Sequence, residues 1–205
     1  GYQSHHPPYV MFNKTGDLIG LDVALMHRLA SRLNVRLEFI PYSRDTMVDQ
    51  LESGQIDLAI GGLMILPERL RRVGFSEPYH SATLAVVVRD HRRHEVKTWS
   101  EVNLIDEARL GAIRRDIARA ARQRLPHIEI IELTSPEPYF DGSRTDLDGL
   151  IMSAEAASAW DVIFPAHEIV IPEPRVERPI GFAMRRDDAS WARMIDLWLE
   201  FERSD

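Results

Sequence analysis

The sequence predicts an α/β fold of two lobes, each a mainly parallel sheet flanked by helices. Short apolar runs rich in β-branched residues alternate with stretches whose apolar residues recur at helical spacing. The alternation occurs in two sets, which a polar stretch separates. Because strands that alternate with helices pair in parallel through crossovers, each set predicts one layered sheet. The 205 residues, 44% of them hydrophobic, are enough to bury a core.

The first set of elements begins with a helix. Residues 21–33 place leucine and methionine side chains at helical spacing, with Asp22 near the helix start, and residues 35–39 then alternate apolar and polar side chains as a strand does. A short helix is expected within residues 46–54, ahead of a near-continuous apolar strand at residues 56–62. Residues 82–90 are rich in β-branched side chains and predict a further strand.

The second set follows the polar residues 89–97, which predict a boundary between the lobes. Its expected elements are strand 109–113, helix 116–125, strand 128–133, strand 146–153, helix 155–163 and strand 168–172. The tail predicts a strand at residues 179–187 and an amphipathic helix at residues 191–201. The two lobes are therefore expected to follow one plan.

Charge and cysteine content exclude several kinds of site. The net charge of −7, from 32 acidic and 25 basic residues, argues against a nucleic-acid partner, since phosphate binding needs clustered basic side chains. The basic run at residues 89–94 is short and is interpreted as a solvated loop. Cysteine is absent, which excludes disulfides, thiolate chemistry and cysteine-based zinc sites. The adjacent His5 and His6 would diverge on a strand, so no metal site is expected there, and no cofactor is expected.

Five motifs along the chain occur in an order typical of one family. They are PPY at 7–9, GDLIGLDVALMHRLASRL at 16–33, LESGQIDLAIGG at 51–62, PER at 67–69 and FSEPY at 75–79. Together they resemble the bacterial extracellular solute-binding proteins of the polar amino-acid class, over nearly the whole chain. The resemblance implies a two-lobed flytrap fold with a ligand in the cleft, and an extracytoplasmic, periplasmic location. It also implies crossings between the lobes at residues 86–92 and 176–183.

Both ends of the chain differ from the family pattern. A full member begins with an apolar strand ahead of the residue matching Gly1, and it usually continues after Asp205 with a glycine turn and a last helix. The chain begins without Met, and no apolar run approaches the ~20 residues that cross a bilayer. We therefore expect a piece of a longer protein. The expected domains are residues 1–89 as lobe 1, residues 90–178 as lobe 2, and residues 179–205 as a return to lobe 1 with a C-terminal helix.

The resemblance assigns the α-carboxylate of the ligand to Arg69. A guanidinium offers a rigid fork of donors for both carboxylate oxygens, and ligands lie at the C-terminal edge of strands in α/β sheets. Gly62 matches a family glycine whose bare backbone lets the ligand approach. Met64 and Leu66 depart from the family, which usually has threonine at both positions, so only the backbone N–H of Met64 remains for the carboxylate. From the residues alone, Arg69 would instead pair with Glu68 or cap a helix, and Gly62 would be an ordinary strand-end turn.

The aromatic wall of the family's pocket matches other residue types in this chain. It falls at His6 and at the segment from Tyr42 to Arg44, so imidazole, phenol and guanidinium groups would bracket the ligand. Tyr9, which follows the proline pair, either contacts the ligand or packs in the core.

The second lobe of the family supplies a Gly-Thr pair at a helix N-terminus and an aspartate for the ligand ammonium. Here the first position reads Arg114, Arg115 and Asp116, where Asp116 is either a ligand contact or the N-cap of its helix and the arginines would add positive charge. Ser153 replaces the aspartate, and Glu155 would substitute for it from a helix start, where a carboxylate is favoured anyway. The carboxylate half of the site is therefore better supported than the amine half.

The expected function is extracytoplasmic binding of a small carboxylate-bearing solute, an amino acid first, without enzyme activity. The partner would be a membrane transporter that a free receptor serves, or a transporter or sensor to which this domain is fused. One alternative is a degenerate regulatory domain that binds no small molecule, which the lost threonine and aspartate positions suggest. Another is an enzyme similar to the cyclohexadienyl dehydratases of this fold, with Glu155 or Asp116 as the acid.

Overall fold

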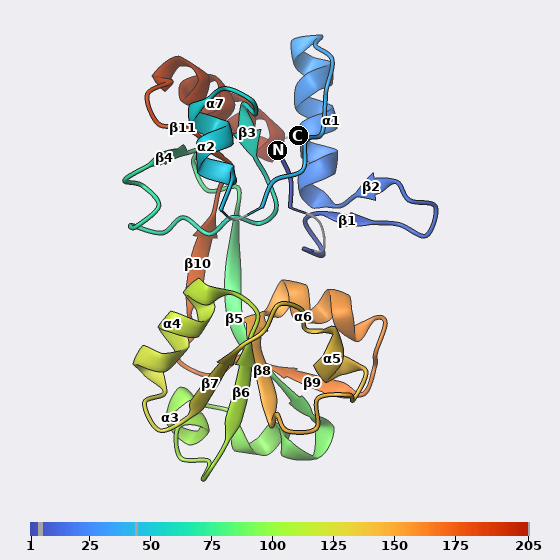
Figure 1. The fold of residues 1–205 in the computed structure, drawn as a ribbon, viewed down its shortest axis with the longest axis vertical. Coiled ribbons are helices and arrows are strands. Elements are labelled where there is room, and N and C mark those ends of the chain that lie inside the picture. The colour runs from blue at the N-terminus through green and yellow to red at the C-terminus, as the bar shows by residue number, and fades with distance from the viewer. Residues whose placement is uncertain (4–5, 44, 205) are drawn as a thin grey trace. The chain divides into compact units, whose positions relative to one another are not determined.

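The protein consists of two compact α/β units (Figure 1). The structure is a computed structural model that describes residues 1–3, 6–43 and 45–204, without the side chains of residues 90, 91, 93 and 116. Unit 1 comprises residues 1–81 and 178–205, and unit 2 comprises residues 82–177. The chain passes from unit 1 to unit 2 through β5 (His80–Arg89) and returns through β10 (Glu177–Ile180). The predicted two-lobed α/β class is confirmed.

The described part of unit 1 contains two small sheets and three helices. Its elements are β1 (Met11–Phe12), β2 (Leu18–Ile19), α1 (Leu21–Leu33), α2 (Met47–Glu52), β3 (Leu58–Ala59), β4 (Val73–Phe75), β11 (Ala183–Arg185) and α7 (Ala189–Ser204). Helix α1 has the predicted bounds and ends at Asn34, whose left-handed conformation (φ 53°) stops the helix. Strand β11 lies between β3 and β4 and is antiparallel to both. Among the described residues of unit 1, the parallel pairing expected here is limited to the bridges that Tyr2 makes with Pro41 and Ile60.

The strand predicted at residues 35–39 does not form. Among the described residues, none receives a backbone hydrogen bond from the N–H groups of residues 36–40, and the side chain of Val35 is 58% exposed. Alternation of side chains was therefore not enough, because a strand is defined by a hydrogen-bonded neighbour. The strand predicted at residues 56–62 is shorter than expected, since Gly61 and Gly62 turn away with positive φ.

The core of unit 1 joins the loop before α2 to the sheet. Tyr42, Met47, Leu51, Ile56, Ala59, Leu63, Val73 and Ala183 form one buried cluster. Burial of this kind is the main stabilising contribution of a small α/β layer.

Unit 2 holds the longer strands. Its elements are β5, the 3₁₀ helix η1 (Asp90–Glu95), α3 (Trp99–Val102), β6 (Arg109–Ala112), α4 (Arg115–Arg124), β7 (Glu129–Glu132), α5 (Glu137–Phe140), β8 (Gly149–Ser153), α6 (Ala154–Asp161) and β9 (His167–Val170). Strand β6 is parallel to β7 and β8, whereas β5 is antiparallel to β8 and β9. The sheet is therefore mixed, because the strand that enters the unit runs against its neighbours. The loop predicted at residues 89–94 is instead largely the 3₁₀ helix η1.

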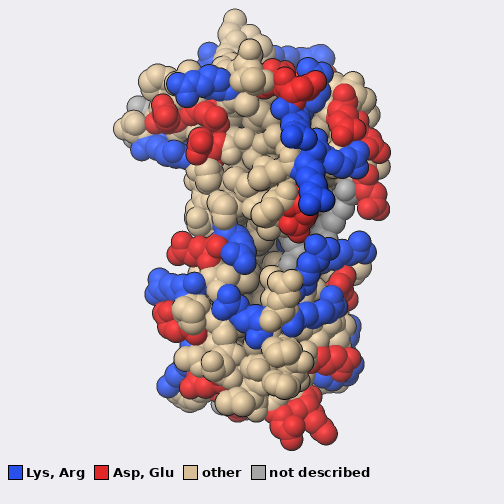
Figure 2. All heavy atoms as spheres, turned by 90° about the vertical axis from the view of Figure 1, so that its left-hand side faces the viewer, with Lys and Arg blue, Asp and Glu red and all other residues tan. Residues whose placement is uncertain are grey.

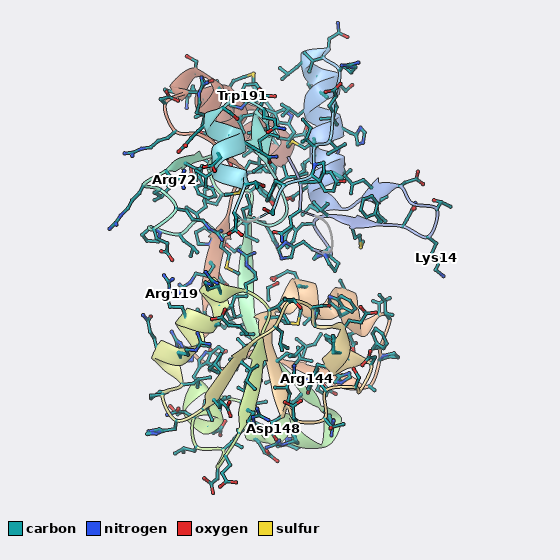
Figure 3. The ribbon with its side chains drawn as sticks, viewed as in Figure 1. Lys14, Arg72, Arg119, Arg144, Asp148 and Trp191 are labelled. Atoms are coloured by element: carbon teal, nitrogen blue, oxygen red, sulfur yellow. The ribbon has the colours of Figure 1, made fainter. Side chains whose placement is uncertain are left out.

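A second apolar cluster and an ionic network fix unit 2. The buried cluster contains Val87, Tyr139, Phe140, Leu147, Leu150, Met152 and Ala157. Asp148 directly precedes β8 and is labelled in Figure 3. Its carboxylate accepts hydrogen bonds from the Arg92 guanidinium and from the backbone N–H of Arg109 (2.9 Å). These bonds tie η1 and β6 to the same strand start.

Charges of both signs are mixed over the surface. On the face shown in Figure 2, arginine and lysine side chains alternate with carboxylates. Arg72 illustrates the pattern, with Asp49 at 3.0 Å and Glu52 at 3.3 Å. Such exposed pairs contribute little to stability, about 0–1 kcal/mol each.

Candidate functional site

Arg69 lies in a turn between β3 and β4 in unit 1. Its guanidinium Nη1 donates a hydrogen bond of 2.9 Å to the carbonyl oxygen of Met64, and its side chain is only partly buried. The backbone of the turn is closed by Arg69 N–H to the Leu66 carbonyl (2.9 Å) and by Val73 N–H to the Arg69 carbonyl (3.1 Å). This arrangement holds one edge of the guanidinium against the backbone of the segment that precedes it.

Met64 contributes its backbone, and not its side chain, to the surroundings of Arg69. The side chain is buried, and the residue forms an antiparallel bridge with Ile180. That bridge uses the N–H groups of Ile65 and Gly181. Among the described residues, the N–H of Met64 itself has no hydrogen-bond acceptor. The carbonyl that orients Arg69 and an N–H donor thus belong to the same residue.

Gly61 and Gly62 form the corner ahead of Met64. Their φ angles are 123° and 64°, which only glycine adopts without strain. A Cβ atom on Gly62 would lie 2.4 Å from the ring of Tyr9, so the ring packs directly on the bare backbone. Tyr9 is 4% exposed, which places it among core residues of unit 1.

Asp22 is the buried carboxylate that the sequence analysis assigned only to a helix start. It lies in the first turn of α1 and is fully buried. Its Oδ2 accepts hydrogen bonds from the N–H groups of Gly61 (2.7 Å) and Gly62 (3.0 Å), and its Oδ1 accepts one from the Tyr79 hydroxyl (2.6 Å). Burial raises the pKa of Asp22, against the opposing effect of these donors and of His80. The only sequence signal was its place in the G-x-x-x-G-L-D motif, which does not reveal a partner some 40 positions away.

Tyr79, the last residue of the FSEPY motif, is fixed on both sides. Its ring stacks on Phe182 with centroids 4.4 Å apart, and its N–H donates to the Ile180 carbonyl (3.0 Å). Burial, with the carboxylate of Asp22 beside it, raises the pKa of Tyr79 well above its ordinary value. The hydroxyl therefore stays protonated and remains a donor to Asp22.

The predicted aromatic wall is only partly described. His6 is half-buried, forms a bridge with Val10 and lies near Gly61, with its Nδ1 3.9 Å from where a Cβ of that glycine would be. Tyr42 belongs to the core of unit 1, and its hydroxyl donates to the Ile60 carbonyl (2.7 Å). Arg44 and His5 lie outside the described residues.

Ser153 and Glu155 both lie at the start of α6 in unit 2. Ser153 is the N-cap of this helix, and its hydroxyl accepts a hydrogen bond from Ala156 N–H (3.2 Å). The Glu155 carboxylate accepts from the Thr83 N–H at 3.2 and 3.3 Å. Ser153 and Glu155 therefore each have a hydrogen-bond partner within unit 2. The partner of Glu155 is Thr83, which belongs to β5.

The residue at the N-cap of α4 is not the one that the sequence predicted. The N-cap of α4 is Arg114, not Asp116, because the helix already begins at Arg115. Arg114 is buried, whereas the Arg115 side chain is 80% exposed and lies 3.7 Å from the Glu132 carboxylate. The side chain of Asp116 lies outside the described part of the structure.

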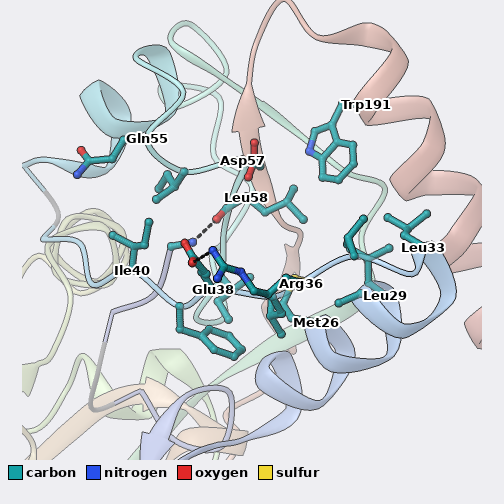
Figure 4. Close-up of a pocket in the computed structure, with 17 residues that line it drawn as sticks. Met26, Leu29, Leu33, Arg36, Glu38, Ile40, Gln55, Asp57, Leu58 and Trp191 are labelled. Carbon is teal, nitrogen blue, oxygen red and sulfur yellow. Dashed lines mark hydrogen bonds and ion pairs between the residues drawn. The ribbon is translucent and has the colours of Figure 1, made fainter.

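A pocket in unit 1 is separate from these residues. It has a volume of about 310 Å³ and lies between residues 35–40 and residues 55–60, with Met26 and Leu29 of α1 along one wall (Figure 4). Trp191 of α7 borders it, and among the described residues its indole N–H has no hydrogen-bond acceptor. Neither Arg69 nor Asp22 lines this pocket, which lies along residues 35–40, the segment that forms no strand.

Comparison with known proteins agrees with this architecture. A family model described as bacterial extracellular solute-binding proteins, family 3, matches residues 1–205. The chain belongs to this family. The predicted resemblance is thereby confirmed, and the two α/β units are the two lobes of a solute-binding protein.

Three relatives of this solute-binding protein carry the names of amino-acid binders. It is 31% identical over 94% of its length to a probable histidine-binding protein of Neisseria gonorrhoeae, covering 73% of that protein. It is 25% identical over its whole length to ABC transporter arginine-binding protein 1 of Escherichia coli, covering 84%. With the arginine-binding periplasmic protein of Mannheimia haemolytica it shares 31% identity over 84 residues, which are 41% of the chain and 35% of the relative.

A solved structure of an ancestral amino-acid-binding protein, AncCDT-1, has the same fold. It is titled a precursor of cyclohexadienyl dehydratase, and it superposes with a TM-score of 0.86 at 25% identity, over 100% of this chain and 89% of the other. In the described parts of this solute-binding protein, no helix combines the length and the hydropathy of a membrane span. The same described residues contain no group of three or more His, Asp or Glu side chains that could hold a metal ion.

Proposed function

We propose that this protein binds a small carboxylate-bearing solute outside the cytoplasm, an amino acid in the first place, with Arg69 as the carboxylate anchor. The observation that carries the proposal is the geometry of Met64 and Arg69. One edge of the guanidinium is held by the Met64 carbonyl, and the side chain is partly exposed. A carboxylate is the natural partner of a fixed guanidinium fork.

The neighbouring backbone supports the same ligand chemistry. The Met64 N–H has no acceptor among the described residues, so it is a suitable second donor for a carboxylate oxygen. Gly62 forms the corner before it, where the Tyr9 ring packs on the bare glycine backbone. The relatives are named for binding arginine and histidine, which supports an amino acid over other carboxylates.

For the remaining parts of the site we infer secondary roles. We infer that His6 and Tyr9 shape the ligand site beside Gly62. Arg44 remains a prediction from the sequence. In unit 2 we infer contacts from Ser153 and Glu155, which would have to exchange their bonds with Ala156 and Thr83 for bonds with the ligand. We also infer that Arg115 and Asp116 lie near the ligand at the start of α4.

For the partner, we infer a membrane transporter that receives the solute. One relative is named as the arginine-binding protein of an ABC transporter. A sensor or a fused transporter domain is the second version of the same binding function. Expression of the chain with its natural flanking sequence, followed by membrane fractionation, distinguishes a free receptor from a fused domain.

The proposal is tested by calorimetric titration of purified protein with L-arginine, L-histidine, L-lysine and L-cystine. We expect at least one to bind, and we expect Arg69→Ala to weaken that binding by about 100-fold, since a charged hydrogen-bonding partner is worth about 1.5–3 kcal/mol. Arg71→Ala is the matched control, because Arg71 is an exposed arginine of the same turn whose carbonyl, not its side chain, accepts a bond from Arg186. If no amino acid binds, or if Arg69→Ala binds as tightly as Arg71→Ala, the proposal is wrong.

We further infer that the protein is not an enzyme. The carboxylate of Glu155, which would be the acid of a dehydratase, is engaged by the Thr83 N–H. A general acid also needs to reach the leaving group. Incubation with prephenate, followed by the absorbance of phenylpyruvate, tests this inference, and turnover that Glu155→Gln abolishes would overturn it.

A further inference from the structure

We propose that Asp22 is a positioning residue for the carboxylate-binding segment, fixing residues 61–64 and through them the guanidinium of Arg69. This inference rests on the proposed function, because it assumes that Arg69 and the Met64 N–H meet the ligand. Asp22 does not touch the ligand in this proposal. It acts only through the backbone that it holds.

The carboxylate of Asp22 is placed to control a segment that would otherwise be loose. Two consecutive glycines have more backbone freedom than any other pair. Both of their N–H groups end on one oxygen of Asp22, at 2.7 and 3.0 Å, in a fully buried environment. Hydrogen bonds to a buried carboxylate are strong and directional, so they define the corner before Met64.

Asp22 also holds the aromatic side of the corner. Its own N–H donates to the Tyr9 carbonyl (3.1 Å), and the Tyr9 ring covers Gly62. One residue therefore fixes both the glycine backbone and the ring that packs on it. Loss of the carboxylate is expected to release the corner even where the ring stays in place.

The contacts that begin at Asp22 return to it. The Asp22 carboxylate accepts from the Gly62 N–H, and Met64, two residues later, forms a β-bridge with Ile180. The Ile180 carbonyl accepts a hydrogen bond from the Tyr79 N–H. The Tyr79 hydroxyl in turn donates to Asp22. Each link lies within unit 1. A closed circuit of this kind resists displacement of any one member, since every link is held from both sides.

The circuit includes the two ends of unit 1 at which the chain leaves and returns. Tyr79 directly precedes β5, and Ile180 ends β10 (Figure 1). The segment that carries the proposed ligand donors and the two connecting strands are thus fixed by one carboxylate. This is a feature that a carboxylate serving only helix α1 would not have.

A double-mutant cycle between Asp22 and Arg69 tests the proposal. The probes are L-arginine and agmatine, which lacks the carboxylate, titrated by calorimetry. We expect Asp22→Ala to weaken L-arginine binding by about 10-fold or more, and Asp22→Ala with Arg69→Ala to be little weaker than Arg69→Ala alone. Agmatine binding is expected to change by less than about 3-fold. A merely structural role predicts equal losses for both probes and additive effects.

Conservative variants provide the matched controls. In Asp22→Asn the side-chain oxygen can still accept from Gly61 and Gly62 while its amide donates to the Tyr79 oxygen, so we expect L-arginine binding within about 3-fold of wild type. Tyr79→Phe keeps both glycine bonds and serves if Asp22→Ala does not fold, and we expect an intermediate loss. Asp17→Ala removes an exposed carboxylate whose partners are Asn13 and Thr15, and should leave binding unchanged.

Amide exchange measured by NMR provides a readout without any ligand. We expect the amides of Gly61 and Gly62 to exchange faster by about 10-fold or more in Asp22→Ala than in wild type, and not in Asp17→Ala. Unchanged exchange, or additive effects in the cycle, would overturn the inference. If wild type binds neither probe nor any amino acid, the proposed function fails, and the exchange experiment still decides whether Asp22 fixes the corner.

Discussion

The residues of the proposed carboxylate site were predicted unevenly from the sequence. Arg69 and Gly62 were proposed because they stand in short motifs whose order is typical of the family. Asp22 was assigned to a helix start, because its partners Gly61 and Tyr79 are distant in sequence. Ser153 shows the opposite case, since its capping bond is local and the side chain had been considered mainly for the ligand. A motif therefore indicates which residues belong together along the chain, but it does not reveal which hydrogen bonds their side chains make.

Gly62 is expected to tolerate no side chain. Gly62→Ala adds a Cβ at 2.4 Å from the Tyr9 ring to a backbone with φ 64°. The left-handed conformation costs about 1–2 kcal/mol and overpacking costs about 1–3 kcal/mol. We expect the free energy of unfolding in urea to fall by about 2–4 kcal/mol.

Gly54→Ala is the control for that substitution. Gly54 has φ 72°, but its Cβ would meet nothing within 4 Å. The control therefore carries only the backbone cost of about 1 kcal/mol. Equal losses for the two variants would show that the Tyr9 contact contributes nothing.

The buried carboxylate of Asp22 is expected to make stability depend on pH. Burial raises its pKa above the ordinary value of 3.8, so over the interval between the two values the folded state holds a proton that the unfolded state has released. Stability from this group is therefore highest at low pH and falls as pH rises through that interval. A charge on His80 opposes the effect by favouring the ionised carboxylate.

Comparison with Asp22→Asn isolates this contribution, because all other carboxylates cancel. Urea unfolding between about pH 4 and pH 7.5 should show wild type losing stability relative to Asp22→Asn as pH rises, by at most about 1.4 kcal/mol per pH unit. A difference that stays constant, or that grows in favour of wild type, would contradict a raised pKa.

At the scale of elements, helices were predicted better than strands. The bounds of α1 agree with the helical spacing at residues 21–33, since that spacing reflects only the helix itself. The strand expected at residues 35–39 depended on a neighbour, and among the described residues none accepts a backbone hydrogen bond from the N–H groups of residues 36–40. The strand predicted at residues 56–62 is likewise shorter than its apolar pattern indicates. The N–H groups of Gly61 and Gly62 donate hydrogen bonds to the Asp22 carboxylate, and the apolar pattern does not reveal this contact.

Helix α6 provides a prediction that separates capping from ligand binding. Ser153→Ala removes the bond to Ala156 N–H, which typically costs about 0.5–2 kcal/mol of stability. Ser153→Asp keeps a good N-cap, so its unfolding midpoint should lie near that of wild type. If Ser153 serves only as a cap, both variants bind the amino-acid ligand equally well.

A ligand role for Ser153 gives a different pattern. Ser153→Asp would then change affinity while keeping stability, and Ser153→Ala would lose both. Thermal unfolding and calorimetric titration of the same two samples distinguish the cases, since the first measures the cap and the second the contact.

At the scale of the whole molecule, the division into two units follows from which strands pair with one another. Residues 84–88 pair along β8, so β5 belongs to unit 2 from residue 82 onward, earlier than the boundary expected from the polar stretch after it. A polar stretch indicates where side chains meet water, whereas the boundary depends on which strands pair. The sequence pattern indicates which side chains meet water, but it does not indicate which strands pair.

Unit 2 is continuous in sequence and contains its own core, which leads to a last prediction. Residues 82–177, expressed alone, should unfold cooperatively, because the cluster around Tyr139, Phe140 and Leu150 lies wholly inside that range. They should show no thermal shift with L-arginine, because the proposed anchor Arg69 lies in unit 1. The full chain, with a bound amino acid at about 100 times its Kd, should gain about 2.7 kcal/mol and a midpoint shift of about 5–10 °C. Arg69→Ala in the full chain should reproduce the absent shift of the isolated unit. A ligand shift in residues 82–177 alone would place the main anchor in unit 2 and contradict the role assigned to Arg69.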